Sequence, residues 1–401
     1  MNATDRIARG DRLESVDALR GFALLAIVLL HNLEHYNIFY GTTTGPAWLQ
    51  WLDTNTTQLI YFLFAGKAYA TFSLLFGFSF FVQMRNARER GYDFRARFAW
   101  RMLLLAGFSQ LHALFYNGDI LLLYAVCGLI LIPASSWSNR TVLAIATTLM
   151  LQPWCWGKIV YALFNPDYID TNSGFTIFAA SAEEVGRNGN LLQTLINNIW
   201  NGQLYSNYWQ LEAGRLFQTP ALFLFGMWLG RKSYFKNTSE SRIFWQKAII
   251  WAIGACIPLY LLKVLVPPHI QQVTVLSYYS IAIPMLYNFA FMTLLVALFM
   301  TAWFHAGNGY RAQRFISPYG RMSLTNYITQ SILGVAVYYH CGLNLWDKTG
   351  AFVSLLIALC IFGVQYAWSV KWLANHRQGP LERLWKLGTW LGNRHTARAN
   401  A

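Results

Sequence analysis

The sequence carries little charge and no cysteine pair at metal-binding or redox spacing. Only 12% of its 401 residues are charged, whereas soluble globular proteins carry about 25%. Its five cysteines are scattered through apolar segments without a Cys-x-x-Cys pair, so they are expected to be small core residues. The sequence also lacks the glycine motifs of P-loop, dinucleotide-binding and serine-hydrolase enzymes. These absences argue against the common soluble enzyme classes.

The sequence is rich in long hydrophobic segments, and 55% of its residues are hydrophobic. About ten segments reach membrane length, which predicts an all-α, polytopic transmembrane helix bundle. The second segment is long enough either to tilt or to break at Gly66. We expect residues 1–401 to form a single integral membrane domain. The segments cover approximately residues 19–35, 57–84, 102–117, 119–134, 141–164, 215–230, 246–266, 279–304, 322–341 and 350–373.

The net charge of +14 is explained by topology rather than by nucleic-acid binding. Most of the 31 lysine and arginine residues fall in alternate loops between the apolar segments. This bias is typical of cytoplasmic loops. It predicts that both termini are cytoplasmic, including a tail at 374–401, and that the lipid bilayer is the main partner.

One long loop, residues 165–214, is predicted to lie on the outer side. Ser181 and Glu184 have the spacing of a helix-capping box. Apolar residues then recur at helical spacing from Leu191 to Trp200, which predicts an amphipathic helix lying on the membrane or over the bundle. Such a loop is either a lid or an inert surface segment.

The first apolar helix carries a charged entry and a polar exit. Asp17 and Arg20 are three residues apart and can pair. Arg20 and His31 share a helical face about 16 Å apart. Either Arg20 is an interfacial arginine at a capped helix start, or it faces a cytosolic opening and binds the phosphates of an acyl-CoA. Three further arginines, which could equally be topology determinants, could add to that site: Arg95, Arg97 and Arg101.

The outer end of this helix holds His31, Glu34 and His35. If the helix persists, all three face one cavity, where Glu34 would orient a histidine acting as base or acyl carrier. The same string matches an H-x-x-E-H zinc motif, but no third ligand is visible, so no metal is expected and a metal site stays a weak alternative. Interfacial histidines without chemistry are a further alternative.

Other polar residues within apolar segments are candidate cavity residues. Lys67 lies inside the second segment and is expected to pair with Glu34 or Asp53, or to line water. His112 and Asp119 flank a predicted tight outer turn, which would hold them at the depth of His31. One polar stripe near the C-terminus either joins helices or lines a cavity; it consists of Ser323, Asn326, Tyr327 and Gln330.

Five stretches resemble the YeiB-like bacterial membrane proteins, a family known as domain of unknown function 418. They are LESVDALRGF (13–22), TFSLLFGF (71–78), HALFYNGDILLLY (112–124), GRMSLTNY (320–327) and GPLERLW (379–385). That family is similar to acyltransferase family 3 and to heparan-alpha-glucosaminide N-acetyltransferase. The family 3 enzymes have an arginine-x10-histidine pattern on the first helix, which Arg20 and His31 reproduce.

The resemblance implies an acyltransferase of the bacterial cytoplasmic (inner) membrane. Acyl-CoA, expected to be acetyl-CoA, would be the donor, and a glycan or small molecule outside the cytoplasm would be the acceptor. A transporter or exporter lined by Lys67, Glu34 and the polar stripe is the alternative, although no inverted repeat is visible. The sequence leaves open whether the protein forms a homo-oligomer.

Overall fold

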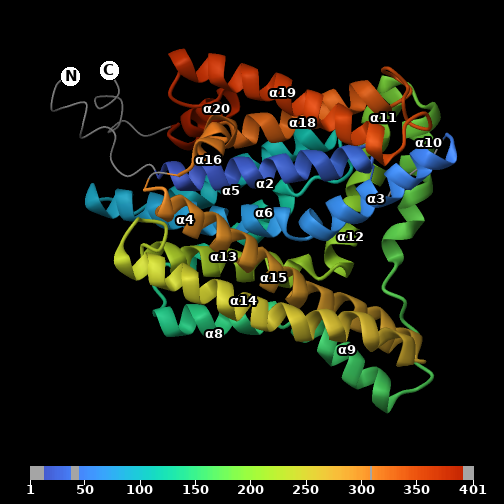
Figure 1. The fold of residues 1–401 in the computed structure, drawn as a ribbon, viewed down its shortest axis with the longest axis horizontal. Coiled ribbons are helices and arrows are strands. Elements are labelled where there is room, and N and C mark those ends of the chain that lie inside the picture. The colour runs from blue at the N-terminus through green and yellow to red at the C-terminus, as the bar shows by residue number, and fades with distance from the viewer. Residues whose placement is uncertain (1–12, 38–44, 308, 392–401) are drawn as a thin grey trace.

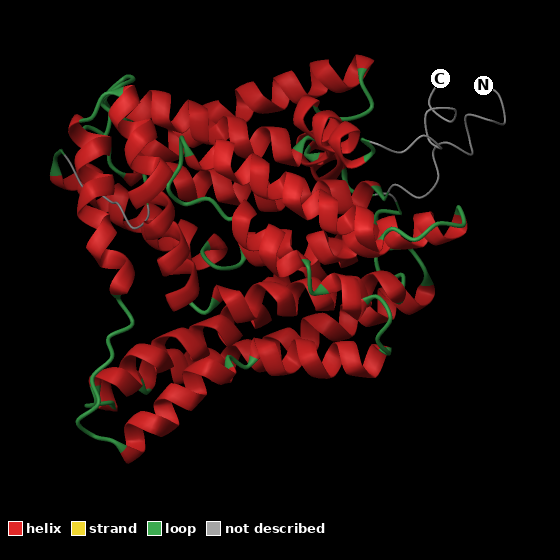
Figure 2. Cartoon of the chain, turned by 180° about the vertical axis from the view of Figure 1, so that it is seen from behind, coloured by secondary structure: helices red, strands yellow, loops and turns green. Residues whose placement is uncertain are grey.

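The structure is a computed structural model that describes residues 13–37, 45–307 and 309–391. These residues form helices and loops without a strand, which confirms the all-α prediction. Figures 1 and 2 show a bundle whose long helices run side by side along the long axis of the molecule. The start of α2 (Glu14–Leu33) and α20 (Pro380–Thr389) lie at the same end of the bundle.

Five helical segments of the described chain are long and apolar enough to cross a membrane. They are α2, the pair α3 (Ala47–Phe64) and α4 (Ala68–Glu89), α14 (Ser239–Leu265) with η3 (Pro267–His269), α15 (Val273–His305) and α19 (Ala351–Asn375). The other predicted spans correspond to shorter helices, so ten crossings and cytoplasmic termini stay predictions. These helices are α5 (Arg95–Ala113), α6 (Leu121–Gly128), α7 (Leu131–Ala134), α8 (Asn139–Met150), α9 (Pro153–Phe164), α13 (Arg215–Arg231) and α18 (Ser323–Tyr338).

The first helix is the enclosed centre of the bundle. In the apolar stretch of α2, 72% is buried inside the protein, whereas in that of α14 only 6% is buried. α14 therefore presents its apolar side chains outward, as a lipid-facing helix does. Helices α4, α19 and the short α17 (Ser317–Arg321) pack around α2. The charged entry and polar exit of α2 are therefore held inside the molecule.

The second predicted span breaks at Gly66, as expected. α3 ends at Phe64, α4 starts at Ala68, and Gly66 between them has a φ of +75°. This left-handed conformation suits glycine because it has no Cβ. A side chain at this position would also collide with the amide of Asn288 on α15.

The long loop at 165–214, which was predicted to be outside, is largely helical and lies against the bundle. It contains η1 (Gly174–Phe178), α10 (Ala179–Asn188), α11 (Leu191–Asn197), η2 (Asn198–Gly202) and α12 (Gln203–Glu212). The predicted capping box was wrong, because Ser181 lies inside α10 and bonds Asn197. The observed box joins Asn190 and Gln193 at the start of α11.

The predicted amphipathic helix is present, with its apolar face turned outward. Leu192 is 65% exposed and Trp200 is 70% exposed, whereas Thr194 and Asn198 are buried against the bundle. Asn198 donates to the carbonyl of Leu114 at the end of α5, at 3.0 Å. The helix therefore covers the bundle with its polar side and turns its apolar side away from it, as a helix at a lipid surface does.

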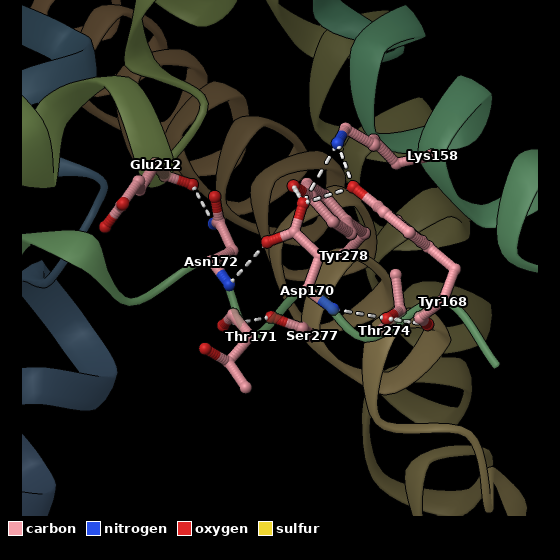
Figure 3. A network of polar contacts seen from close by, with 9 residues as sticks. All are labelled: Lys158, Tyr168, Asp170, Thr171, Asn172, Glu212, Thr274, Ser277 and Tyr278. Atoms are coloured by element: carbon pink, nitrogen blue, oxygen red, sulfur yellow. Dashed lines mark hydrogen bonds and ion pairs between the residues drawn. The ribbon is translucent and has the colours of Figure 1, made fainter.

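A polar cluster fastens the start of this loop to α9 and α15 (Figure 3). The Asp170 carboxylate accepts hydrogen bonds from Tyr278 at 2.7 Å, from Lys158 at 2.9 Å and from Tyr168 at 3.0 Å. Burial opposes ionisation of Asp170, but these bonds outweigh it and lower its pKa to about 2. The loop is thus held by an ionised carboxylate at neutral pH.

Candidate active site

A cavity of about 500 Å³ lies at the end of the bundle formed by α20, the last turns of α4 and the starts of α5 and α18. Several cationic side chains line it, and Glu382 is the one carboxylate among the lining residues. Aromatic and aliphatic side chains line the rest of the wall. The cations are Arg20, Arg90, Arg101, Arg321 and Lys386. An anionic ligand with an apolar part fits this composition.

Arg20 enters the cavity from α2 and is fixed by two partners. Its guanidinium lies 3.0 Å from the Asp17 carboxylate, as predicted, and 2.6 Å from the Ser79 hydroxyl on α4. Gly320 of α17 allows the close approach that places this pair, since a Cβ there would lie 1.9 Å from the Asp17 carbonyl oxygen. Arg20 therefore presents a positioned positive charge to the cavity.

The three arginines of α5 have different surroundings, and Arg101 is the one of the three that lines the cavity. The Arg101 guanidinium lies 3.5 Å from the centroid of the Trp385 ring, and both residues line the cavity. Arg97 donates to the carbonyls of Thr389 and Leu391, which holds the end of α20. Arg95 pairs with Asp93 on the surface.

The segment predicted as a cytoplasmic tail contains a wall of the cavity. Glu382 of α20 accepts hydrogen bonds from the backbone N–H groups of Leu324 and Thr325, at 2.7 and 3.1 Å, and from the Thr325 hydroxyl at 2.6 Å. These bonds cap the N-terminus of α18. Burial raises the pKa of Glu382 although the bonds oppose the shift. Trp385 completes the attachment by donating to the Arg101 carbonyl.

Tyr327 forms the inner end of the cavity. It is only 5% exposed, and its ring centroid lies 4.8 Å from that of His112 and 6.4 Å from that of His31. Tyr116 packs on both histidines from another side, at 5.8 and 4.7 Å. His31 and His112 therefore contact the same two tyrosine rings, which is consistent with the expectation that they lie at one depth. Contrary to our expectation, His31 does not line this cavity, because the side chain of Tyr327 lies between them.

His31, Glu34 and His35 do not share one site. α2 ends at Leu33, and His35 has a φ of +49°, so the helical face expected to carry all three residues does not persist. His35 contacts the Trp346 carbonyl at 2.8 Å and the Ser354 hydroxyl at 2.9 Å, and it stacks on Tyr338. It is a buried structural residue.

Glu34 also turns away from the histidines. Its carboxylate accepts a hydrogen bond from Tyr61 at 2.9 Å rather than orienting His31. The polar contact of the His31 ring is instead with the Gln330 amide, 3.5 Å from Nδ1. Among the described residues there is no group of three side chains that could hold a metal ion.

The arrangement that was expected of His31, an imidazole oriented by a carboxylate, is found instead at the buried His112. We call the chain of Asp119, His112 and Ser331 the relay. The Nδ1 of His112 lies 2.6 Å from the Asp119 carboxylate, and its Nε2 lies 2.8 Å from the hydroxyl of Ser331 on α18. The other Asp119 oxygen accepts from the Ser109 hydroxyl and from the Leu122 N–H. The sequence analysis missed Ser331 because 219 residues separate it from His112, so no spacing signal connects them.

Comparisons with known proteins show what the chain resembles. The family model described as "Protein of unknown function (DUF418)" matches residues 229–392. The C-terminal part of the chain is therefore similar to the DUF418 family. The match includes α18 and α20, and therefore Tyr327, Ser331 and Glu382.

Curated relatives match the chain over nearly its whole length. It is 26% identical to "Uncharacterized protein YxaH" of Bacillus subtilis, covering 98% of the chain and 97% of the relative. It is 26% identical to "Uncharacterized 39.9 kDa protein in amylase 3'region" of Bacillus acidopullulyticus, covering 96% of each chain. "Uncharacterized protein YeiB" of Escherichia coli is 24% identical over 94% of this chain and 96% of its own.

Lys67 is buried, but the prediction that it pairs with Glu34 or Asp53 was wrong. Its ammonium group lies 5.6 and 5.3 Å from the ring centroids of Tyr287 and Phe291 on α15. Asp53 instead accepts a hydrogen bond from the Phe352 N–H at 2.8 Å and caps the start of α19. The aromatic faces therefore stabilise the lysine.

The polar stripe of α18 divides between the two expected roles. Ser323 and Tyr327 line the cavity. Asn326 joins helices, donating to the Tyr319 carbonyl and to the Ser369 hydroxyl. Gln330 is fully buried beside His31.

Proposed function

We propose that this protein is a transmembrane acyltransferase of the bacterial cytoplasmic membrane. The cavity would bind acyl-CoA from the cytosol, with acetyl-CoA as the expected donor. The acyl group would pass to an acceptor on the outer side, such as a glycan. One observation carries this proposal: a cavity with a cationic lining ends at Tyr327, which packs beside His31 and His112.

The lining of the cavity supports a coenzyme A ester as the ligand. Arg321 and Lys386 supply cations for phosphate groups, which arginine binds particularly well because its guanidinium is planar. Tyr92 and Trp390 offer aromatic faces for an adenine ring. A volume of about 500 Å³ lies in the range of small-molecule sites.

Of the two histidines beside Tyr327, the geometry favours His112 as the general base. Its Nδ1 is held by Asp119 at 2.6 Å, and such a carboxylate fixes the tautomer that leaves Nε2 free to accept a proton. Within the described part of the chain, His31 has the 3.5 Å amide contact of Gln330 and ring contacts, and no carboxylate bond is seen. The role of base therefore moves from His31 to His112 in this proposal.

The transporter alternative receives less support. It requires Lys67, Glu34 and the stripe of α18 to line one path. Lys67 rests on aromatic rings of α15, Glu34 bonds Tyr61, and only part of the stripe reaches the cavity.

The test is acetyl-CoA binding and transfer by the purified full-length protein. We expect radiolabelled acetyl-CoA to bind and to label a component of envelope extract. Arg321→Ala should weaken binding about tenfold, or about 1.4 kcal/mol. Arg95→Ala is the matched control, because Arg95 lies on the same face of the bundle outside the cavity lining and pairs with Asp93. Absence of binding and of transfer in the wild-type protein would refute the proposal.

A further inference from the structure

A buried polar cluster joins α18 to the end of α5 and the turn that follows it, which are distant in the sequence. Ser331 on α18, His112 on α5 and Asp119 in the following turn form a continuous hydrogen-bonded chain, with links of 2.8 and 2.6 Å. Ser331 and His112 have no exposed surface, and Asp119 is 5% exposed. This order of hydroxyl, imidazole and carboxylate is that of a nucleophile relay.

The carboxylate end of the relay is fully held. One Asp119 oxygen bonds His112, and the other accepts from Ser109 and the Leu122 N–H. A carboxylate fixed in this way orients the imidazole and stabilises it when it becomes charged. The Ser331 hydroxyl is thereby placed to give its proton to Nε2.

The relay also lies between two hollows. Tyr327 lines the large cavity and sits one helical turn before Ser331 on α18, so the two side chains share a face. Asp119 and Ser109 line a hollow of about 10 Å³ beneath Ser206 of the outer loop helix α12. A group on the relay is thus adjacent to the donor cavity on one side and to the outer loop on the other.

We propose that Ser331 is the nucleophile of a covalent acyl-enzyme, an inference that rests on the proposed acyltransferase function. Its oxygen attacks the thioester carbonyl of acyl-CoA while His112 takes the hydroxyl proton. The carbon–sulfur bond breaks, and His112 returns the proton to the coenzyme A sulfur. An acyl ester of Ser331 remains.

The second half of the reaction consumes this ester from the outer side. A hydroxyl or amine of the acceptor attacks the ester carbonyl and gives its proton to His112. The ester carbon–oxygen bond breaks, and the proton passes from His112 to the Ser331 oxygen. Donor and acceptor therefore never occupy the site together, and a ping-pong scheme results.

The test uses the purified full-length protein with acetyl-CoA and no acceptor. We expect exchange of labelled coenzyme A into acetyl-CoA, because formation of the acyl-enzyme is reversible. We also expect one acetyl group on the Ser331 peptide, removable by alkaline hydroxylamine. Ser331→Ala should lower exchange by about 10³-fold or more.

Two further variants separate chemistry from folding. Ser331→Cys retains a nucleophile and should carry the label as a thioester, cleaved by hydroxylamine already at neutral pH. Ser354→Ala is the matched control, because Ser354 forms another buried serine–histidine bond, with His35 at 2.9 Å, at a site away from the cavity, where the second ring nitrogen of His35 contacts the Trp346 carbonyl. This control should exchange at the wild-type rate.

The possible failures are distinguishable. If the wild-type protein transfers acetyl groups but shows neither exchange nor label on residue 331, or if Ser331→Ala transfers at the wild-type rate, the covalent step is wrong and the acyltransferase proposal stands. If the wild-type protein neither binds nor transfers acetyl groups, both proposals fail.

Discussion

The ring of Tyr327 packs against the imidazole of His112, with their centroids 4.8 Å apart, and separates the cationic cavity from the buried histidines. The cavity and the chain of Ser331, His112 and Asp119 are therefore neighbours, but they are not connected in this structure. Displacement of one side chain would connect them, which makes Tyr327 the natural place to test the link.

Tyr327→Ala should open the cavity to His112. We expect faster hydrolysis of acetyl-CoA, because water can then reach the relay, and a loss of stability of about 3 kcal/mol from the removed ring. Coenzyme A release and thermal unfolding measure the two effects. Tyr327→Phe keeps the ring and should behave like the wild type in both assays. Unchanged hydrolysis in the alanine variant would show that Tyr327 is not the barrier.

His112→Ala and His31→Ala should differ in acyl transfer. Removal of His112 takes away the partner of Asp119 and Ser331, so we expect a loss of about 10³-fold or more in the rate. Removal of His31 should cost less, because its ring contacts are packing contacts with Tyr116 and Tyr36. Transfer rates at saturating acetyl-CoA decide between them. A greater loss in His31→Ala would return the role of base to the first helix.

Glu382→Ala should detach α20 from the bundle. The carboxylate caps α18 through Leu324 and Thr325, and loss of a cap costs about 1–2 kcal/mol. We expect faster hydrogen exchange in α20 and weaker acetyl-CoA binding. Glu382→Gln retains an acceptor oxygen and should lie between the alanine variant and the wild type. Equal exchange in all three proteins would mean that other contacts hold α20.

The pH dependence of stability should reveal the Asp170 cluster. Its pKa of about 2 lies below the ordinary aspartate value, so its stabilisation is complete above about pH 4 and declines as the pH falls toward 2. Asp170→Asn should lose about 1–2 kcal/mol at neutral pH, and its deficit should shrink in acid. The control is Asp167→Asn, which changes an exposed neighbour. A deficit independent of pH would exclude the ionised carboxylate as its cause.

Topology can be tested with single added cysteines. We expect Asn188→Cys, on the outer loop, to react with an impermeant maleimide in intact cells. Glu240→Cys, at the start of α14, should react only after lysis. Both positions are exposed in the structure, so accessibility of the side chain itself is matched. The reverse pattern would invert the predicted orientation.

Local patterns in the sequence predicted the helices and several of their features. Hydropathy located α2, α14, α15 and α19. The glycine at 66 predicted the break, and the three-residue spacing predicted the pair between Asp17 and Arg20. These features depend on residues within one or two helical turns, so the sequence contains the information directly. The arginines of α5 and the tail beyond residue 374 were less predictable, because their contacts are with each other across the fold.

The sequence by itself determined that this is an all-helical membrane protein with a charged entry and histidines on its first helix. Only the tertiary structure decided which histidine is held between a carboxylate and a hydroxyl. The end of α2 at Leu33 turns His35 into the core, while the fold brings Ser331 of α18 within hydrogen-bond distance of His112 on α5. The physical reason is that a hydrogen-bonded relay needs atoms within about 3 Å. Helix packing, and not the spacing of residues along the chain, sets that distance.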